Sequence, residues 1–231
     1  MYNKPENLDD ESDVDTQISA NEVVDQLRSE GFGVSIIGIG LDEINRIKEI
    51  KSDLVFNLVE WTGKNIVGGT EVIKILERRK IPFTGSGSWG FMLSSDKVQM
   101  KKEMAKNKIL TPGHKFPMIV KPAYEHCGIG ITQKSIVQNA SELRIKKYEL
   151  RKKYRQPIIA EEFIDGRELQ MTILEKNGLP WVLPAAEVVF DKPGMVLSYE
   201  MKWVEKSPEY NQSHMEPAKL DQRLEIEIDK V

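Results

Sequence analysis

Residues 53–60, DLVFNLVE, form a nearly continuous apolar run between two segments with helical spacing. A run of this length is typical of a strand that is buried on both faces, as the strands of parallel sheets are. The same alternation continues on both sides of the run, with expected helices at residues 18–28, 42–50, 70–79 and 94–108 and an expected strand at 34–39. We expect Ser94 or Ser95 to cap the last of these helices, with Asp96 in its first turn. Repeated alternation of helix and apolar strand predicts an α/β layer with a parallel sheet.

The second half of the chain has a different order of expected strands and helices. Strands are expected at residues 118–123, 130–137 and 158–164, a charged helix at 141–154 and a hairpin whose turn contains Asn177 and Gly178. Short strands joined by tight turns favour antiparallel pairing, so this half predicts an α+β layer. The Lys and Arg residues between Arg144 and Arg155 are most simply the solvated face of their helix, and a binding patch is the alternative.

Charge and hydropathy exclude several classes of partner. A net charge of -3 over 231 residues gives no reason to expect a nucleic-acid partner, which requires clustered positive charge. No apolar run approaches the length of a membrane span. The first residues, MYNKPENLDDESDVD, are polar and acidic, whereas a signal peptide needs a basic start and an apolar centre. We therefore expect a cytoplasmic protein with no membrane partner, folded as one large or two modest domains.

Cys127 is the only cysteine, which excludes an intramolecular disulfide and argues against a thiolate zinc cluster. The histidines, His114, His126 and His214, form no local metal-binding signature. A cysteine directly after His126 suggests a nucleophile and its base. Against this, adjacent residues need not point together, and the sequence shows no third group to orient them.

The stretch FPMIVKPAYEHCGIGI, residues 116–131, combines a short apolar strand ending in Lys121 with a glycine-bearing loop. A lysine ammonium supplies a point charge for a polyphosphate. Gly128 and Gly130 let backbone N–H groups approach phosphate oxygens without interference from a Cβ atom. The alternative is a buried strand whose last lysine reaches solvent before an ordinary hairpin.

The strand IIAEEFIDGRE has the order of groups that a nucleotide hinge requires. Glu161 and Glu162 end the strand, and backbone groups near Phe163 and Ile164 are placed to read an adenine edge between apolar walls. The carboxylate of Glu168 is an acceptor for ribose hydroxyls. The alternative is a strand that runs into a turn with exposed acids.

The segment LSYEMKW places Lys202 between the aromatic residues Tyr199 and Trp203. A mobile loop of this composition suits closure over a phosphate, with exclusion of water from a reactive intermediate. Simple packing of aromatic residues near a lysine is the alternative.

As an ordered set, these segments resemble the ATP-grasp ligases, and specifically the D-alanine–D-alanine ligase family. The matching segments are DLVFNLVE, IPFTGSG, SSDK, MIVKPAYE, IIAEEFIDGRE and SYEMKW. The resemblance covers nearly the whole chain and implies an ATP-grasp fold, α/β and α+β, with an N-terminal Rossmann-like domain. The implied parts are a truncated first domain at residues 1–90, a helical connection at 91–115, a small subdomain at 116–168 and the start of a large subdomain at 169–231.

The resemblance also implies roles for single residues. Lys97 and Lys121 match the family's phosphate-binding lysines, and the loop from Glu125 through Cys127 and Gly128 to Gly130 matches its flexible phosphate cover. The adenine hinge corresponds to Glu161, Glu162, Phe163 and Ile164, with Glu168 at the ribose position. Tyr199, Lys202 and Trp203 match the closing loop, whose lysine reaches the terminal phosphate.

In such ligases ATP phosphorylates a carboxylate, with magnesium present, and an amine then attacks the acyl phosphate. The resemblance implies ATP and small amino acids as ligands, a place in peptidoglycan biosynthesis and a possible homodimer or complementing chain. It does not name the amino acids that are joined.

The chain departs from the family pattern at several positions. Cys127 and Gly128 stand where the family usually has serines, and the connection at residues 111–116 is short. The polar start lacks the family's first strand and glycine loop, and the chain stops before the segment that holds magnesium, so we expect truncation at both ends. A non-catalytic or decayed ATP-binding module, or one half of a split ligase, is the alternative function.

The tail of the chain offers one substitute for the missing magnesium ligands. Glu225, Glu227 and Asp229 would share one face if the tail formed a strand. The resemblance instead places them at the start of a helix, where they would be ordinary surface residues.

Overall fold

The structure is a computed structural model that describes residues 1–228, apart from the side chain of Lys64. Its residues form two compact units, which are described separately. Unit 1 comprises Met1–Glu103, Lys121–Gly130 and Lys147–Ile159, and unit 2 comprises Met104–Val120, Ile131–Lys146 and the described part of Ala160–Val231. The domain boundaries given above divide the chain differently and stay a prediction.

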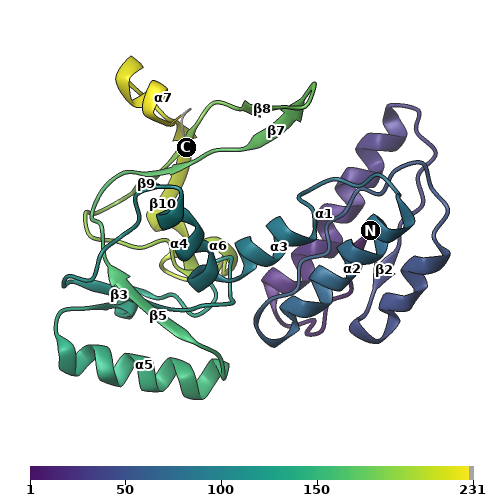
Figure 1. Cartoon of the computed structure of the whole chain (residues 1–231). Helices are drawn as coiled ribbons and strands as arrows, with labels where there is room; N and C mark the ends of the chain where they lie inside the picture. The colour runs from purple at the N-terminus through teal and green to yellow at the C-terminus, as the bar shows by residue number, and fades with distance from the viewer. Residues whose placement is uncertain (229–231) are drawn as a thin grey trace. The chain divides into compact units, whose positions relative to one another are not determined.

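The elements up to residue 106 are two short strands, each followed by helices (Figure 1). In chain order they are β1 (Tyr2–Asn3), α1 (Glu11–Ser29), β2 (Gly38–Ile39), η1 (Leu41–Glu49), η2 (Gly63–Asn65), α2 (Ile66–Arg79), α3 (Ser88–Ser95) and α4 (Lys97–Lys106). The strands β1 and β2 pair in parallel, as an α/β layer requires.

Two expectations for this region are wrong. The polar start was expected to lack a strand, yet it supplies β1, which pairs with β2 and forms a parallel bridge from Tyr2 to Leu58. The run at residues 53–60 is not buried on both faces, because Val55 and Val59 are buried while Leu54 is 55% exposed. Isolated parallel bridges, including one from Val55 to Phe83, take the place of the long strand.

The core of unit 1 lies between α2 and the parallel segments. Its members are Ile39, Ile47, Val55, Val59, Trp61, Val72, Ile75 and Leu76. The apolar residues of α2 recur at helical spacing and are buried to 2% exposure or less at Val72, Ile75 and Leu76. Burial of each such side chain stabilises the fold by about 1.5–3 kcal/mol.

Capping residues explain where the helices of unit 1 begin. The carboxylate of Asp10 accepts a hydrogen bond from the Ser12 N–H at 3.0 Å, so α1 begins at Glu11, earlier than expected. The expected cap at Ser94 or Ser95 is wrong, since both residues end the additional helix α3. Asp96 caps α4 instead, because its Oδ1 accepts from the N–H of Val98 at 2.9 Å.

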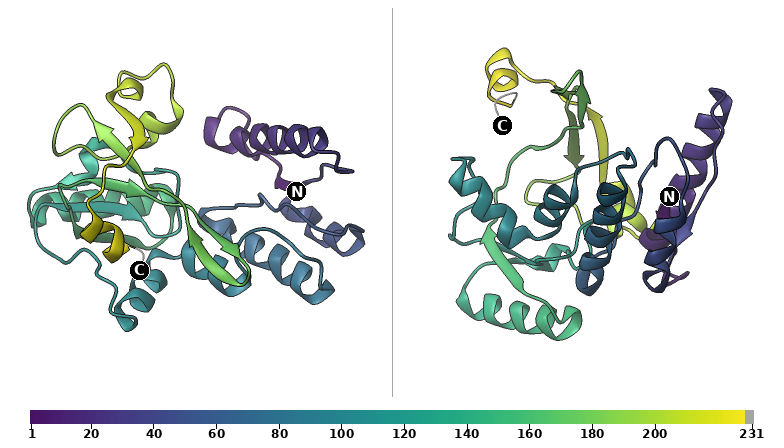
Figure 2. Two further views of the ribbon diagram at one scale, coloured as in Figure 1. Left: turned by 90° about the horizontal axis from the view of Figure 1, so that it is seen from above. Right: turned by 45° about the vertical axis from the view of Figure 1, so that its right-hand side comes forward.

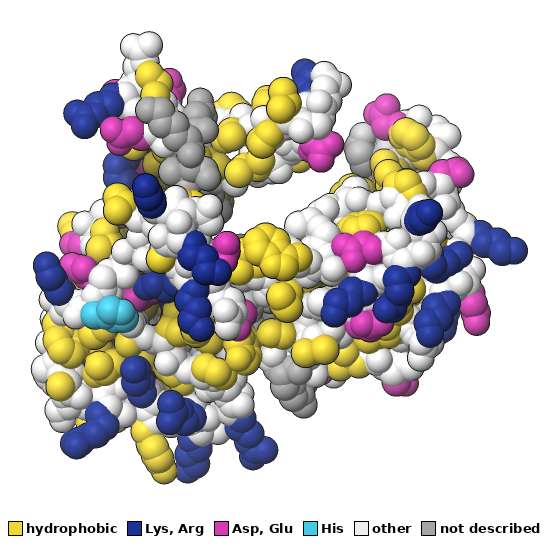
Figure 3. All heavy atoms as spheres, viewed as in Figure 1, with side chains coloured by type: hydrophobic (Ala, Val, Ile, Leu, Met, Phe, Trp, Pro, Cys, Tyr) yellow, Lys and Arg dark blue, Asp and Glu magenta, His cyan; other side chains and the backbone are white. Residues whose placement is uncertain are grey.

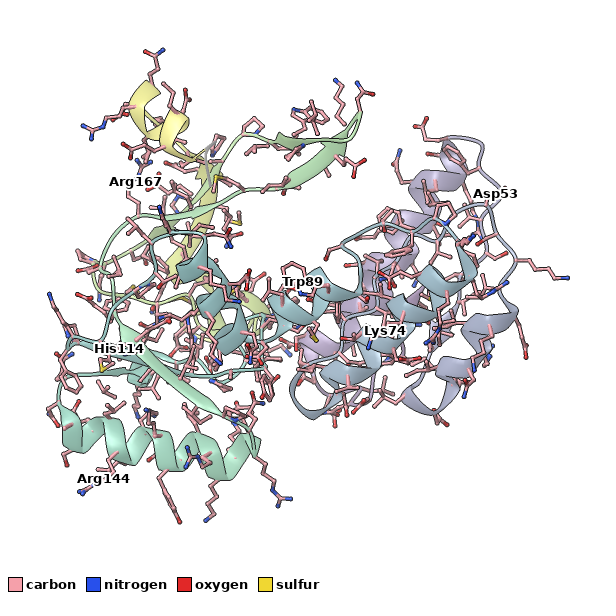
Figure 4. The ribbon with its side chains drawn as sticks, viewed as in Figure 1. Asp53, Lys74, Trp89, His114, Arg144 and Arg167 are labelled. Carbon is pink, nitrogen blue, oxygen red and sulfur yellow. The ribbon has the colours of Figure 1, made fainter. Side chains whose placement is uncertain are left out.

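The next segment forms a three-stranded sheet of order β4-β3-β5. Its elements are β3 (Met118–Pro122), η3 (Gln133–Ser135), β4 (Ile136–Val137), α5 (Ala140–Tyr154) and β5 (Ile158–Glu162). β3 and β4 are antiparallel, and α5 runs along this sheet (Figures 1 and 2). Arg144 points away from the sheet in Figure 4, and basic side chains cover the outer side of α5 in Figure 3, as a solvated face requires.

Unit 2 also contains an antiparallel sheet of order β10-β9-β6 and a separate hairpin. The elements are β6 (Glu168–Gln170), β7 (Ile173–Lys176), β8 (Leu179–Val182), β9 (Ala186–Phe190), α6 (Tyr199–Trp203), η4 (Tyr210–Gln212), β10 (Ser213–Pro217) and α7 (Gln222–Ile228). The expected hairpin turn is confirmed, with positive φ at Asn177 (56°) and Gly178 (77°).

The two described acids of the tail do not lie on a strand. Glu225 and Glu227 belong to the helix α7, and Asp229 lies outside the described residues. No helix within residues 1–228 is long and apolar enough to cross a membrane.

Candidate functional site

Lys97, at the start of α4, is bound to the chain that follows β3. Its backbone N–H donates to the Ala123 carbonyl at 3.1 Å, and its ammonium group donates to the Glu125 carbonyl. Two contacts from one residue fix the beginning of α4 against the loop at residues 124–130. The structure therefore brings together two segments that the sequence analysis singled out, both within unit 1.

Gln156 holds the loop from the other side, and no pattern in the sequence pointed to this residue. The Tyr124 N–H donates to Gln156 Oε1 at 2.7 Å, and Gln156 Nε2 donates to Glu125 Oε1 at 2.7 Å. Gln156 and Glu125 are both only 8% exposed. The N–H of Gly63 adds a bond to the Tyr124 carbonyl at 3.0 Å. The carboxylate of Glu125 is therefore a buried anchor of the loop and not a group on its surface.

The loop continues as a tight turn. The Ile129 N–H donates to the His126 carbonyl at 3.0 Å, and φ is positive at both central residues, Cys127 (56°) and Gly128 (81°). Gly130 follows with φ +79°, and a Cβ atom there would lie 2.8 Å from Cγ of Pro122. Backbone conformation and crowding both require glycine at position 130.

Lys121 lies on β3, whose other residues, Met118, Ile119, Val120 and Pro122, are all buried. Lys121 itself is half-buried. A strand packed on both faces therefore gives the side chain of Lys121 a rigid base.

The hinge segment is fixed by backbone bonds within unit 2. Glu162 donates its N–H to the Gly113 carbonyl at 2.8 Å, and Phe163 donates its N–H to the Pro117 carbonyl at 2.8 Å. Ile164 is 61% exposed, and within residues 1–228 its N–H has no hydrogen-bond partner. The backbone donor that is available to a ligand is therefore the N–H of Ile164. From the sequence alone, it could equally have been the N–H of Phe163.

The acids of the hinge occupy different surroundings. Glu161 is 7% exposed, whereas Glu162 is half-buried with Oε2 close to Gly113. Glu168 begins β6, where it is half-buried and pairs with Val188 of β9.

An ion pair that the sequence did not indicate joins the residue just before β6 to a residue of the neighbouring strand β9. Arg167 donates from Nε to Glu187 Oε1 at 2.7 Å and also bonds the Lys219 carbonyl at 3.1 Å. The hydrogen bond from Arg167 lowers the pKa of the Glu187 carboxyl. Two anchors on one guanidinium orient the start of β6 beside Glu168.

The segment expected to close over the phosphate contains the short helix α6 (Tyr199–Trp203). Ser198, 1% exposed, caps α6 by accepting from the Met201 N–H at 3.3 Å. Gln133 makes two bonds to Val196, at 2.7 Å and 3.1 Å, and holds the segment before the helix. Lys202 is exposed, and within residues 1–228 its ammonium group has no partner.

Unit 1 contains a cavity of about 300 Å³ that the sequence analysis did not identify. Its lining residues include the acids Asp15 and Glu60, and among the others are Thr16, Ser86 and Phe91. None of the lining residues is basic. Charge and size therefore suit a small solute that carries an ammonium group.

Comparison with known proteins gives a consistent result. The family described as the D-ala D-ala ligase C-terminus matches residues 84–231. The D-alanine–D-alanine ligase of Pseudomonas putida (strain GB-1) is 27% identical over 222 residues, which is 89% of this chain and 64% of that protein. The chain thus spans about two thirds of the length of such curated relatives.

Solved structures agree. A D-alanine–D-alanine ligase from Bacillus anthracis superposes with a TM-score of 0.65 at 23% identity, over 93% of this chain and 71% of that one. A structure of such a ligase from the same organism complexed with ATP gives a TM-score of 0.58 at 20% identity, over 85% of this chain and 63% of that one. This likeness confirms the ATP-grasp fold expected from the sequence.

Proposed function

Because the chain belongs to the D-ala D-ala ligase C-terminus family, we propose that it is an ATP-dependent carboxylate–amine ligase of the D-alanine–D-alanine ligase type. The observation that carries the proposal is the extent of the family match, residues 84–231, which includes every nucleotide-site residue expected from the sequence, from Lys97 to Trp203. The proposed reaction transfers the terminal phosphoryl group of ATP to a carboxylate. An amine then attacks the acyl phosphate and releases phosphate.

The lysines of unit 1 would bind the phosphates. The ammonium of Lys97 is held at the loop by its bond to the Glu125 carbonyl, and Lys121 lies on the strand that leads into the loop. Positive charge and backbone N–H groups at one loop favour a polyphosphate, and the charge of the transferring phosphoryl group is spread by fixed cations. The anchoring through Gln156 supports a loop that is already in place before the nucleotide binds.

The hinge would bind the nucleoside. The unpartnered N–H of Ile164 is suited to a ring nitrogen of adenine, and the exposed Ile164 side chain provides an apolar surface for the base. Glu168 would accept hydrogen bonds from the ribose hydroxyls.

Lys202 would act on the terminal phosphate. It extends from a capped helix and lacks a competing ion pair within the described residues, so its charge is available to a ligand. Tyr199 and Trp203, on the same helix, would exclude water from the acyl phosphate.

The cavity of unit 1 would hold one amino acid substrate. The carboxylates of Asp15 and Glu60 complement a substrate ammonium group. A pocket of about 300 Å³ admits a small amino acid. The residues present do not name the amino acid further.

Magnesium is the metal that the resemblance implies as the partner of ATP. Within residues 1–228 no three side chains of His, Cys, Asp or Glu are grouped to hold a metal ion. Magnesium usually takes one or two carboxylates together with the phosphates. We assign no residue to it and derive no step through it.

Calorimetric titration with ATP tests the proposal. Lys121→Ala should weaken binding roughly tenfold to hundredfold, the effect of losing a charge-assisted hydrogen bond. Lys51→Ala, at an exposed lysine of unit 1, is the matched control and should leave the affinity unchanged. Equal affinities for the two variants would count against the site.

A second measurement separates the ligase from a non-catalytic ATP-binding module. The ligase should release ADP and phosphate when magnesium and a small amino acid are supplied. ATP binding without such release would favour the module or a chain completed by another polypeptide. The proposal extends to a cytoplasmic role in peptidoglycan synthesis, and gel filtration with light scattering would determine whether the chain forms a homodimer.

A further inference from the structure

Three side chains of unit 1 form a chain of contacts that the proposed reaction does not require. The Nδ1 atom of His126 lies 3.1 Å from Sγ of Cys127, and the Nε2 atom of the same ring lies 3.3 Å from Oε1 of Glu60. The sequence places His126 and Cys127 next to each other but shows no group to orient them. The structure supplies that group as Glu60, from a segment distant in the sequence.

These contacts decide the role of each ring nitrogen. A carboxylate only accepts hydrogen bonds, so the nitrogen that faces Glu60 carries a hydrogen. In the neutral ring, the nitrogen that faces Cys127 is then an acceptor for the thiol proton. Glu60 also stabilises the imidazolium that proton transfer creates. A nucleophile, a base within reach and an acid that orients the base are together the parts of an activated nucleophile.

The group is accessible to a small molecule. The side chains of His126 and Glu60 are 30% and 57% exposed, and Cys127 is half-buried. Glu60 also lines the cavity of about 300 Å³. The cavity is an observation independent of the hydrogen bonds, and it shows that one end of the group borders a space that a small solute can enter.

The backbone holds the thiol in this position. Cys127 has φ +56° in the turn closed by the Ile129 N–H and the His126 carbonyl. Glycine and asparagine are the residues that adopt this conformation readily. The turn is tied to the buried Glu125 and Gln156, so the thiol has little freedom to leave the imidazole ring.

We propose that Cys127 is a modification site, a reactive thiol that undergoes exchange with low-molecular-weight disulfides. The Sγ proton passes to Nδ1 of His126, and the thiolate attacks one sulfur of the disulfide. The bond between the two reagent sulfurs breaks as a bond to Cys127 forms. The leaving thiolate takes the proton from His126, so that Cys127 is oxidised and one half of the reagent is reduced to a thiol.

The consequence for the nucleotide rests on the proposed function. An adduct on Cys127 would occupy space at the loop that is proposed to cover the phosphates. Modification should therefore weaken ATP binding, and reduction of the mixed disulfide should restore it. Serines, which the resemblance leads one to expect here, could not be switched in this way.

Oxidised glutathione is the probe, and mass spectrometry of the intact chain gives the rate of adduct formation. Cys127 is the only cysteine, so every adduct reports on this thiol. Cys127 should react about threefold to tenfold faster than N-acetylcysteine at neutral pH, since a larger thiolate fraction is partly offset by lower nucleophilicity. His126→Gln and Glu60→Gln should each reduce the rate to about that of the free thiol.

Glu49→Gln, at an exposed position of η1, should react as fast as the parent chain. Circular dichroism of each variant separates loss of the base from loss of the fold. Parent, His126→Gln and Glu60→Gln chains that all react at the rate of N-acetylcysteine would overturn the proposal. ATP titration of the unmodified chain distinguishes the two proposals, because absent ATP binding with a fast thiol rejects only the proposed function.

Discussion

Two turns of this molecule have nearly the same backbone and very different surroundings. In the β7–β8 hairpin, Asn177 and Gly178 have φ 56° and 77°, and in the loop after β3, Cys127 and Gly128 have φ 56° and 81°. The hairpin flanks its turn with exposed residues, including Ile173 and Leu179, and extends from unit 2 (Figures 1 and 2). The loop is tied to buried polar groups of unit 1.

The difference shows what selects the residues of each turn. Asn-Gly is the pair that tolerates two positive φ angles best, so local preference alone explains the hairpin. Cysteine has no such preference, and it stands in a turn that tertiary contacts hold in place. A residue that is locally unfavourable in a rigid, polar setting indicates selection for chemistry.

The largest effect should come from removing the anchor that only the loop possesses. Gln156→Leu leaves the Tyr124 N–H and the buried carboxylate of Glu125 without their shared partner. We expect the free energy of unfolding to fall by about 3–4 kcal/mol, the cost of two unsatisfied buried groups. Urea denaturation followed by circular dichroism measures it.

Gln17→Leu, at an exposed position of α1, is the control for this substitution and should change the unfolding free energy by less than about 0.5 kcal/mol. If Gln156→Leu and Gln17→Leu had the same unfolding free energy, the hydrogen bonds of Gln156 would contribute nothing to stability. The two turns would then not differ in how they are held.

The contrast also marks the limit of prediction from sequence. The hairpin follows from Asn177 and Gly178 alone, and α5 follows from local spacing, so both were predicted nearly to their ends. The anchor depends on Gln156, which is 31 residues from Glu125, and no local pattern connects the two. The strand β1 was missed for the same reason, because only its pairing with β2 makes it a strand.

The candidate site also has features that local sequence predicts and features that depend on contacts between residues distant in the sequence. Ordered motifs located Lys97, Lys121 and the hinge, since the resemblance preserves their sequence of appearance. Hydrogen-bond partners decided the details that motifs leave open, such as the donor at Ile164 and the helix at Tyr199–Trp203. Glu60 gained its role only through a contact with His126 across the fold.

A matched pair of glycines separates backbone strain from packing. Gly130 and Gly178 have φ +79° and +77°, but a Cβ atom meets Pro122 Cγ at 2.8 Å in the first and nothing within 4 Å in the second. Gly130→Ala should cost about 3 kcal/mol and Gly178→Ala about 1 kcal/mol, since only the first adds overpacking to the left-handed conformation.

Urea midpoints of the two alanine variants give the comparison directly. Gly166→Ala is the control, with ordinary contact to Ile164 at 3.8 Å and no positive φ. Equal losses at Gly130 and Gly178 would mean that the surroundings of the loop are as permissive as those of the hairpin.

Exchanging the first residue of each turn tests the assignment to chemistry. Cys127→Asn should stabilise the loop by about 0.5 kcal/mol, and Asn177→Cys should destabilise the hairpin by a similar amount, because asparagine accepts the left-handed conformation more readily. The urea midpoints check both changes. A loss of stability in Cys127→Asn would show that the contact with His126 holds the turn, which would give Cys127 a structural reason to be there.

The smallest expected effect is a dependence of stability on pH. It sets the pH range in which the stabilities of the turn variants can be compared. The side chain of Lys4 and the N–H of Gly40 bond Glu43 in unit 1 and lower its pKa from the ordinary value of 4.5 to about 2. A carboxyl group whose pKa is lower in the folded chain than in the unfolded chain contributes its full stabilisation at any pH above the unfolded-state pKa. The difference in unfolding free energy between the parent chain and Glu43→Gln should therefore be constant above about pH 4.5. It should shrink as the pH falls toward 2 and vanish below that value. Acid titration of the unfolding midpoint checks this, with Glu49→Gln as the control, and a difference that changed between pH 5 and 9 would place another titrating group in the comparison.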